Sequence, residues 1–104
     1  MDRLAALHAF LLDDPNDPFT RFAVAQEYAS AGRDVEAVAA YEALVRDRPD
    51  YVGTYYHLGA LYRRVGRPAE ADATLTAGIA AATAAGDLHA RAELQRALLD
   101  DDAP

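Results

Sequence analysis

The sequence predicts an all-α fold of stacked helix pairs, and three observations lead to this prediction. Apolar residues recur at helical spacing through most of the 104 residues, and no segment shows the two-residue alternation of a β-strand. Short breaks rich in Pro, Gly and Asp separate the helical stretches. The pattern of residues 21–37 also returns at 55–71. A sequence pattern that returns at constant spacing indicates a structural repeat.

The two copies are related by an offset of 34 residues. The identical residues at matching positions are Tyr28 and Tyr62, Gly32 and Gly66, Arg33 and Arg67, Glu36 and Glu70, and Ala37 and Ala71. Both glycines stand where a helix is expected to end in a left-handed residue. Asp34 is then expected to cap the next helix with its side chain, and Pro68 suits a first helical position through its fixed φ. Each copy is therefore predicted to be a helix, a tight turn and a second helix.

The breaks and the offset divide a single domain, 1–104, into four segments. They are an N-terminal helix at 2–13, a first repeat at 18–49, a second repeat at 52–83 and a capping helix at 87–100. The helix at 2–13 matches the second helix of a repeat, because Leu7, Leu11 and Pro15 fall in register with the first repeat. The alternative for this stretch is a secretory signal, which His8 and the missing cleavage motif disfavour.

Both ends of so short a stack are expected to need covers, because each repeat buries its face only on its neighbours. The expected cover at the N-terminal end consists of Leu4, Leu7, Phe10 and Leu11. At the other end the expected apolar side consists of Leu88, Ala90, Ala92, Leu94, Leu98 and Leu99. Glu93 falls where the repeats have Ala25 and Gly59, so a capping helix is expected there and not a third repeat.

The composition disfavours several classes of function. A net charge of −7 and a pI near 4.7 argue against binding to nucleic acid or to an anionic membrane. The absence of cysteine excludes disulfides, thiolate metal sites and cysteine nucleophiles. All basic residues are arginine, which a GC-rich genome or adaptation to high salt would explain. No stretch approaches the roughly 20 apolar residues of a membrane span, so a cytoplasmic protein is expected.

Catalytic and metal-binding constellations are not apparent in the sequence. His8, His57 and His89 lie on three predicted helices without the spacing of metal ligands. The acidic runs fall in predicted turns and in the tail, where solvated carboxylates are expected. The glycines are isolated and form no phosphate-binding loop. The sequence therefore predicts no cofactor, no metal site and no enzyme.

The helix pair of 34 residues resembles the tetratricopeptide repeat (TPR). The eight signature positions hold Arg21, Val24, Ala25, Tyr28, Ala37, Tyr41, Leu44 and Pro49 in the first copy, and Tyr55, Leu58, Gly59, Tyr62, Ala71, Leu75, Gly78 and Thr83 in the second. Most match the family pattern in type; Arg21, Leu44, Leu75 and Thr83 depart from it. The resemblance implies an α-α superhelix, or solenoid. With Met1 at the start and a cap at each end, a small stand-alone protein of the bacterial kind is expected.

The resemblance also implies a binding surface, because in this family the first helices of successive repeats line a concave groove that holds peptide segments. Carried over by position, the groove residues are Phe19, Phe22, Gln26, Tyr56, Ala60, Arg63 and Arg64. Two arginines beside aromatic side chains suit a partly apolar peptide that carries a carboxylate. The alternatives are that the two phenylalanines pack on Leu7 and Leu11, and that the arginines form an ordinary solvated face.

Two functional hypotheses follow. The first is a non-enzymatic adaptor or scaffold that binds a protein or peptide partner in the groove. A chaperone-tail binder is not expected, because Phe22 and Gln26 stand where such binders carry lysine and asparagine. The second hypothesis is a self-assembling structural module, a homodimer whose apolar terminal helices form the interface.

Overall fold

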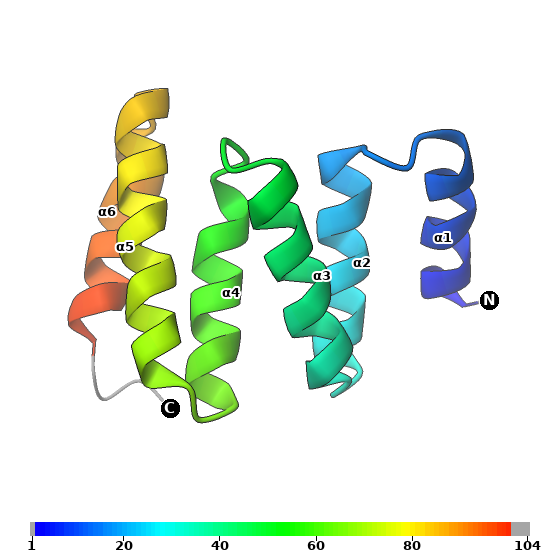
Figure 1. Ribbon diagram of the computed structural model, residues 1–104, viewed down its shortest axis with the longest axis horizontal. Coiled ribbons are helices and arrows are strands. Elements are labelled where there is room, and N and C mark those ends of the chain that lie inside the picture. The colour runs from blue at the N-terminus through cyan, green and yellow to red at the C-terminus, as the bar shows by residue number, and fades with distance from the viewer. Residues whose placement is uncertain (1, 101–104) are drawn as a thin grey trace. The chain divides into compact units, whose positions relative to one another are not determined.

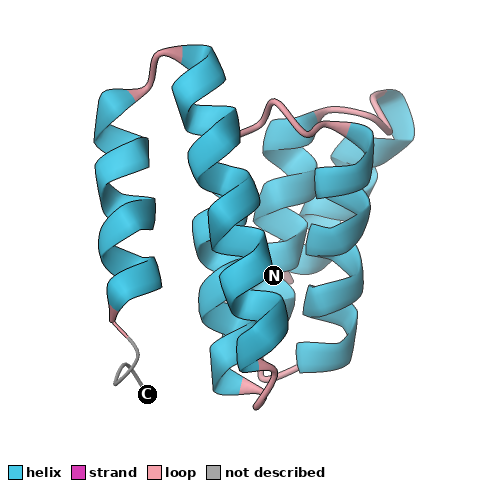
Figure 2. Ribbon diagram, turned by 60° about the vertical axis from the view of Figure 1, so that its left-hand side comes forward, coloured by secondary structure: helices cyan, strands magenta, loops and turns pink. Residues whose placement is uncertain are grey.

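The computed structural model describes residues 2–100, in two compact units that meet in sequence between Arg48 and Pro49. The first unit contains α1 (Arg3–Asp13), α2 (Pro18–Ser30) and α3 (Asp34–Asp47), and the second contains α4 (Gly53–Arg64), α5 (Pro68–Ala85) and α6 (Leu88–Leu99) (Figure 1). Over residues 2–100 the regular elements are all helices, joined by short loops (Figure 2). The predicted all-α fold class is confirmed.

Aspartate side chains cap three of the helices. The carboxylate of Asp17 accepts hydrogen bonds from the backbone N–H and the hydroxyl of Thr20, which lower the pKa of Asp17. Asp2 and Asp87 cap α1 and α6 in the same way. The prediction for Asp34 is wrong: the N-cap residue of α3 is Arg33, and Asp34 is the first helical residue, where its charge favours the helix N-terminus. Pro68 is the first residue of α5, as predicted.

The turn between the two helices of a pair is built twice with the same backbone geometry. Gly32 and Gly66 have φ values of 75° and 81°, which confirms the predicted left-handed residues. The backbone N–H after each glycine returns to the carbonyl of the repeated tyrosine, at 2.9 Å for Arg33 to Tyr28. The equivalent hydrogen bond in the second turn measures 2.8 Å. These bonds satisfy carbonyl groups that the helix end would otherwise leave unpaired.

The side chains repeated at the same offset reinforce each turn. The guanidinium of Arg33 lies over the ring of Tyr28, 4.8 Å from its centroid, and pairs with the carboxylate of Glu36. The second turn repeats both contacts through Tyr62, Arg67 and Glu70, with 4.7 Å between guanidinium and ring centroid. The hydrogen bonds from Arg67 lower the pKa of Glu70. Four of the five repeated residues, the tyrosine, glycine, arginine and glutamate, therefore fix the turn.

Helices α4 and α5 approach closely because glycine occupies the contact on each side. A Cβ atom added at Gly59 would lie 2.7 Å from Cδ2 of Leu75. A Cβ atom added at Gly78 would lie 2.5 Å from Cβ of Tyr55 and 3.2 Å from Cδ1 of Leu94. All three distances are shorter than ordinary carbon contacts. The second unit therefore depends on the missing side chains at these two positions.

In the first unit, α2 and α3 bury both small and large side chains. Ala25 and Ala37 are fully buried, and the buried ring of Tyr41 meets Phe22 edge-on, with 5.9 Å between ring centroids. Arg21, which departs from the family pattern, is held by an ion pair: its Nη2 lies 2.9 Å from Oδ2 of Asp47.

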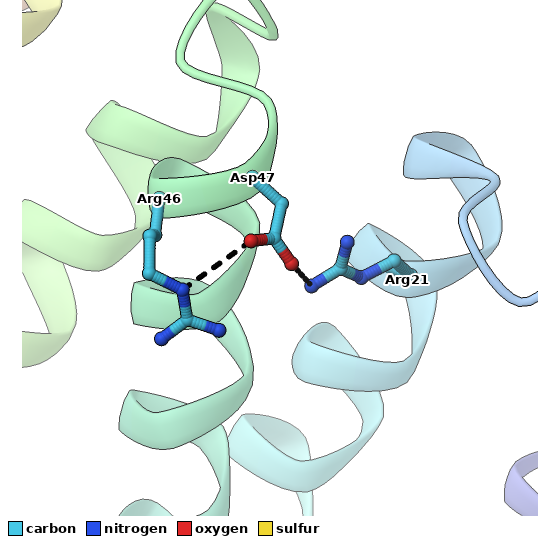
Figure 3. Close-up of polar contacts among 3 residues, drawn as sticks. All are labelled: Arg21, Arg46 and Asp47. Atoms are coloured by element: carbon cyan, nitrogen blue, oxygen red, sulfur yellow. Dashed lines mark hydrogen bonds and ion pairs between the residues drawn. The ribbon is translucent and has the colours of Figure 1, made fainter.

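Figure 3 shows Asp47 between Arg21 and Arg46, whose Nε lies 3.3 Å from the other carboxylate oxygen. The hydrogen bond from Arg21 is the main cause of a lowered pKa of Asp47. The side chain of Arg21 is largely buried, whereas that of Arg46 is exposed. An ion pair between α2 and α3 thus takes the place of an apolar contact at the Arg21 position.

The terminal helices bury a different set of side chains from the set that the sequence predicts. The predictions for Phe10, Leu88 and Leu99 are wrong, because these side chains are 64%, 69% and 82% exposed. Ala92 is exposed as well. Leu94 is buried, and Leu4, Leu7, Leu11, Ala90 and Leu98 are half-buried. Each terminal helix therefore packs through one narrow stripe and leaves large apolar side chains outside it.

We expect Gly78→Ala to lower the free energy of unfolding. Overpacking against Tyr55 should cost about 1 to 3 kcal/mol, against a gain of about 1 kcal/mol from the helix propensity of alanine. Chemical denaturation followed by circular dichroism measures the difference. The matched control is Gly53→Ala, because a Cβ there would meet only Tyr51 at 3.9 Å. Equal stability of the two variants would contradict the close contact at Gly78.

We expect Thr54→Val to raise the free energy of unfolding by about 1 kcal/mol, because a buried hydroxyl without a partner is costly. Thr54 is fully buried, and its Oγ1 has no hydrogen-bond partner within residues 2–100. Thr54→Ser keeps the hydroxyl and removes a methyl group, so it should lower stability by about 1 kcal/mol. A loss of stability in the valine variant, measured by the same denaturation, would reveal a hydrogen bond at Oγ1.

Candidate peptide-binding surface

Three of the seven residues predicted for the binding surface lie on α2, in the first unit. Phe19 is largely exposed, which disfavours the alternative that it packs against α1. Phe22 is half-buried and packs edge-on against Tyr41. Gln26 is half-buried one turn further along the helix. Phe19 is therefore the most accessible aromatic side chain of this set.

The other four predicted residues lie on α4, in the second unit. Tyr56 is 44% exposed, and Ala60 and Arg64 are exposed. The side chain of Arg63, by contrast, is only 11% exposed. Three of these residues are thus accessible, and the fourth is held within the unit.

Arg63 joins the three helices of the second unit. Its Nη2 lies 2.9 Å from Oδ1 of Asp72 on α5, and its Nη1 donates to the carbonyl of Ala97 on α6 at 2.9 Å. A second bond from Nη1 reaches the carbonyl of Asp100 at 2.5 Å. These carbonyls lie at the C-terminal end of α6, where a cation is favourable; that of Ala97 also accepts the backbone N–H of Asp100. The guanidinium therefore helps to fix the end of α6 beside α4.

A hollow of about 210 Å³ lies between α4 and α6. Its lining consists of Val52, Gly53, Tyr56, His57, Ala90, Glu93 and Leu94. A smaller hollow of about 110 Å³ is lined by Tyr56, Glu93, Arg96, Ala97 and Asp100. Tyr56 and Glu93 border both hollows, so the two form one surface along the α4–α6 side of the unit.

The polar groups of the α4–α6 surface have unequal surroundings. The rings of Tyr56 and His57 meet edge-on, with 5.7 Å between centroids. Partial desolvation lowers the pKa of His57, and the carboxylate of Glu93 opposes this shift. Glu93 also lies 3.8 Å from Nε2 of His89, one turn earlier on α6. The surface thus offers an aromatic ring, an imidazole whose neutral form is favoured, and a carboxylate.

The α6 side of this surface was not predicted from the sequence. Glu93, Leu94, Arg96 and Ala97 all come from the helix that the sequence predicts only as a cap. Glu93 did give a signal, because it places a charged residue where both repeats have a small one. A charge at that position indicates that α6 does not pack there against a following helix in the way that α4 packs against α5.

Other kinds of site receive no support from the described residues. Within residues 2–100, no group of three or more His, Cys, Asp or Glu side chains is placed to hold a metal ion. None of the helices described is long and apolar enough to span a lipid bilayer.

We expect Arg63→Met to lower the free energy of unfolding by about 1.5 to 3 kcal/mol, because charged hydrogen bonds to a partly buried carbonyl end are lost. Amide hydrogen exchange should accelerate in the last turn of α6 more than in α4. The control is Arg96→Met, which removes an exposed guanidinium from the same unit. Unchanged exchange in α6 would show that Arg63 does not hold that helix end.

The comparisons with known proteins agree with this architecture. A family model described as TPR repeat matches residues 25–66. The solution structure of a tetratricopeptide repeat domain protein from Salinibacter ruber is 48% identical, has a TM-score of 0.80, and aligns over 84% of this chain and 88% of its own. The crystal structure of a tetratricopeptide repeat domain protein from the same organism is 48% identical with a TM-score of 0.77, over 81% and 93% of the two chains.

A solution structure of a Bordetella parapertussis protein is 26% identical with a TM-score of 0.80, over 94% of this chain and 85% of its own. Among curated proteins the sequence finds no significant match. The 48% identity over most of both chains, together with the 34-residue helix pairs, shows that this chain belongs to the tetratricopeptide repeat family.

Proposed function

We propose that this chain is a non-enzymatic adaptor that binds a peptide segment of a partner protein on the α4–α6 surface. Tetratricopeptide repeats generally act as protein-interaction modules. The observation that supports this particular surface is the position of Tyr56, which borders both hollows while 44% of it remains exposed. Large, rigid aromatic side chains at the edge of an apolar hollow are typical anchors of protein interfaces.

The lining of the larger hollow suits an apolar side chain of the ligand. Val52, Ala90 and Leu94 contribute apolar walls, and Tyr56 stands at the edge. An apolar side chain that leaves water for this hollow would gain hydrophobic stabilisation in proportion to the area buried. The backbone of an extended or helical segment would then run across the exposed ring of Tyr56.

The charges around the hollows favour a basic residue beside that apolar side chain. Glu93 and Asp100 supply two carboxylates, against the single guanidinium of Arg96. The carboxylate-bearing ligand expected from an arginine pair receives less support, because Arg63 is engaged with Asp72 and with α6. Phe19, Phe22 and Gln26 stay in the proposal as a separate contact surface on the first unit. The cytoplasmic setting expected from the sequence also stays a proposal.

The test is selection from a displayed library of random peptides against the purified chain. We expect enriched peptides to combine an aromatic or aliphatic residue with a nearby Lys or Arg. Tyr56→Ala should weaken their binding by more than about tenfold, and Glu93→Arg should remove the preference for basic residues. Isothermal titration with a synthetic enriched peptide measures both effects.

The control for this experiment is Val35→Ala, which removes an exposed apolar side chain from the first unit. It should bind the enriched peptides as the wild type does. Peptides that bind the Tyr56→Ala chain with unchanged affinity would move the site elsewhere. Failure to enrich any peptide would count against peptide binding altogether.

A second candidate function is self-association, and the exposed apolar residues of the terminal helices favour it. Phe10 and Leu12 on α1, and Leu88 and Leu99 on α6, are all largely exposed in the described structure. Apolar side chains grouped on a helix surface mark sites of protein contact when they form a patch. We therefore also propose that two copies of the chain bind each other through these helices.

A further inference from the structure

The two hollows beside α6 are related by a shift along that helix. On the α6 side the larger hollow is lined by Ala90, Glu93 and Leu94, and the smaller one by Glu93, Arg96, Ala97 and Asp100. Moving the first set forward by three residues gives Glu93, Arg96 and Ala97, which all belong to the second set. With the rise of an α-helix, three residues correspond to about 4.5 Å. The hollows therefore follow each other along α6 at a helical spacing.

The side chains on one face of a helical ligand have the same spacing. In a helix, residues three and four positions apart lie on one face, about 4.5 and 6 Å apart along the axis. In an extended segment, side chains on one face are two residues apart, which is about 6.6 Å. The shift between the hollows matches the helical spacing more closely. Two neighbouring side chains on one face of a helix can therefore enter both hollows together.

The walls of the larger hollow also favour a helical backbone. Val52, Ala90 and Leu94 contribute apolar side chains to its lining. An extended ligand presents backbone N–H and C=O groups along its whole length, and these groups are costly to bury over apolar walls without hydrogen-bond partners. A helix pairs the same groups within itself. A helical ligand can thus cover the hollow with side chains alone.

The two hollows differ in charge. Glu93 borders both, and the smaller hollow adds the carboxylate of Asp100 and the guanidinium of Arg96, all on exposed residues. Two carboxylates against one guanidinium favour a cationic side chain of the ligand there. The net charge of −7 acts in the same direction. The larger hollow, with its apolar walls, suits an apolar side chain.

We propose that the ligand of the α4–α6 surface is an amphipathic helix, with an apolar side chain in the larger hollow and a Lys or Arg three or four residues away in the smaller hollow. Tyr56 and Glu93, which border both hollows, would lie between these two side chains of the ligand. This inference rests on the proposed peptide binding and specifies the conformation and the sequence pattern of the ligand.

The experiment is selection of a second displayed library against the purified full chain. One Leu and one Arg are held two, three or four residues apart in each peptide, in both orders, and the other positions are random. We expect separations of three and four to be enriched over a separation of two. By isothermal titration, the tightest peptides of those classes should bind at least about fivefold more strongly, because residues two apart do not share a helix face.

A proline placed between the Leu and the Arg of the tightest peptide tests the helix directly. It should weaken binding by at least about tenfold, because an interior proline breaks a helix. Alanine at the same position is the control and should leave the affinity unchanged. Circular dichroism of the mixture should also show more helix than the sum of the separate peptide and chain. Binding that tolerates the proline would overturn the helical ligand.

Two variants of α6 test the place of the basic side chain. Arg96→Gln removes the guanidinium that lines the smaller hollow, and the matched control Arg91→Gln removes the same charge from a residue that lines neither of the two hollows. We expect Arg96→Gln to tighten binding of the selected peptide by up to about fivefold, and Arg91→Gln to have a smaller effect. Equal effects of the two variants would overturn the placement of the basic side chain in the smaller hollow.

The outcomes separate the helical ligand from peptide binding itself. Enrichment of the two-residue separation would overturn the helical ligand and leave peptide binding at Tyr56 standing. A second library that enriches nothing, although the fully random library gave binders that depend on Tyr56, would do the same. Failure of both libraries would overturn the proposed function, and this inference with it.

Discussion

The close approach of α4 and α5 at two glycines is the constraint on which the second unit depends. Gly78 lies against both Tyr55 and Leu94, so the same missing side chain sets the position of α4 and of α6 relative to α5. Because the hollow beside Tyr56 is formed by α4 and α6, its width follows from this contact. Arg63 then fixes the far end of α6 through the carbonyl of Ala97. The geometry of the proposed binding surface is therefore a consequence of core packing.

The helices and turns could be predicted because their signals are local and occur twice. Gly32 and Gly66 need a left-handed backbone, and the arginine after each glycine meets a tyrosine and a glutamate within the same turn. Which sides of the terminal helices are covered could not be predicted in the same way. Helical spacing groups Leu88 with Leu99, but only the packing of α6 on α5 decides that Leu94 is buried instead.

The proposed binding surface overlaps the surface predicted from the sequence only in part, for a comparable reason. Tyr56 follows from its position on a first helix, whose exposed side the repeat pattern identifies. The position of a residue on a helix does not determine which group the end of a long side chain will contact. Arg63 reaches the carbonyl of Ala97, 34 residues away in sequence, and this contact could not be predicted. Glu93 broke the repeat pattern, and that departure was the sequence signal for the contribution of α6.

The partners that this acidic protein can bind depend on which of its arginines already form ion pairs within the chain. Arg21, Arg33, Arg63 and Arg67 each form an ion pair with a carboxylate of the same unit. An intramolecular pair leaves the net charge of −7 unchanged, but it reduces the number of cations available to a ligand. The electrostatic field around the protein therefore comes mainly from carboxylates, which repel nucleic acid and attract basic peptide segments. The basic residue proposed to bind next to Glu93 would be favoured by this field as well as by the hollow.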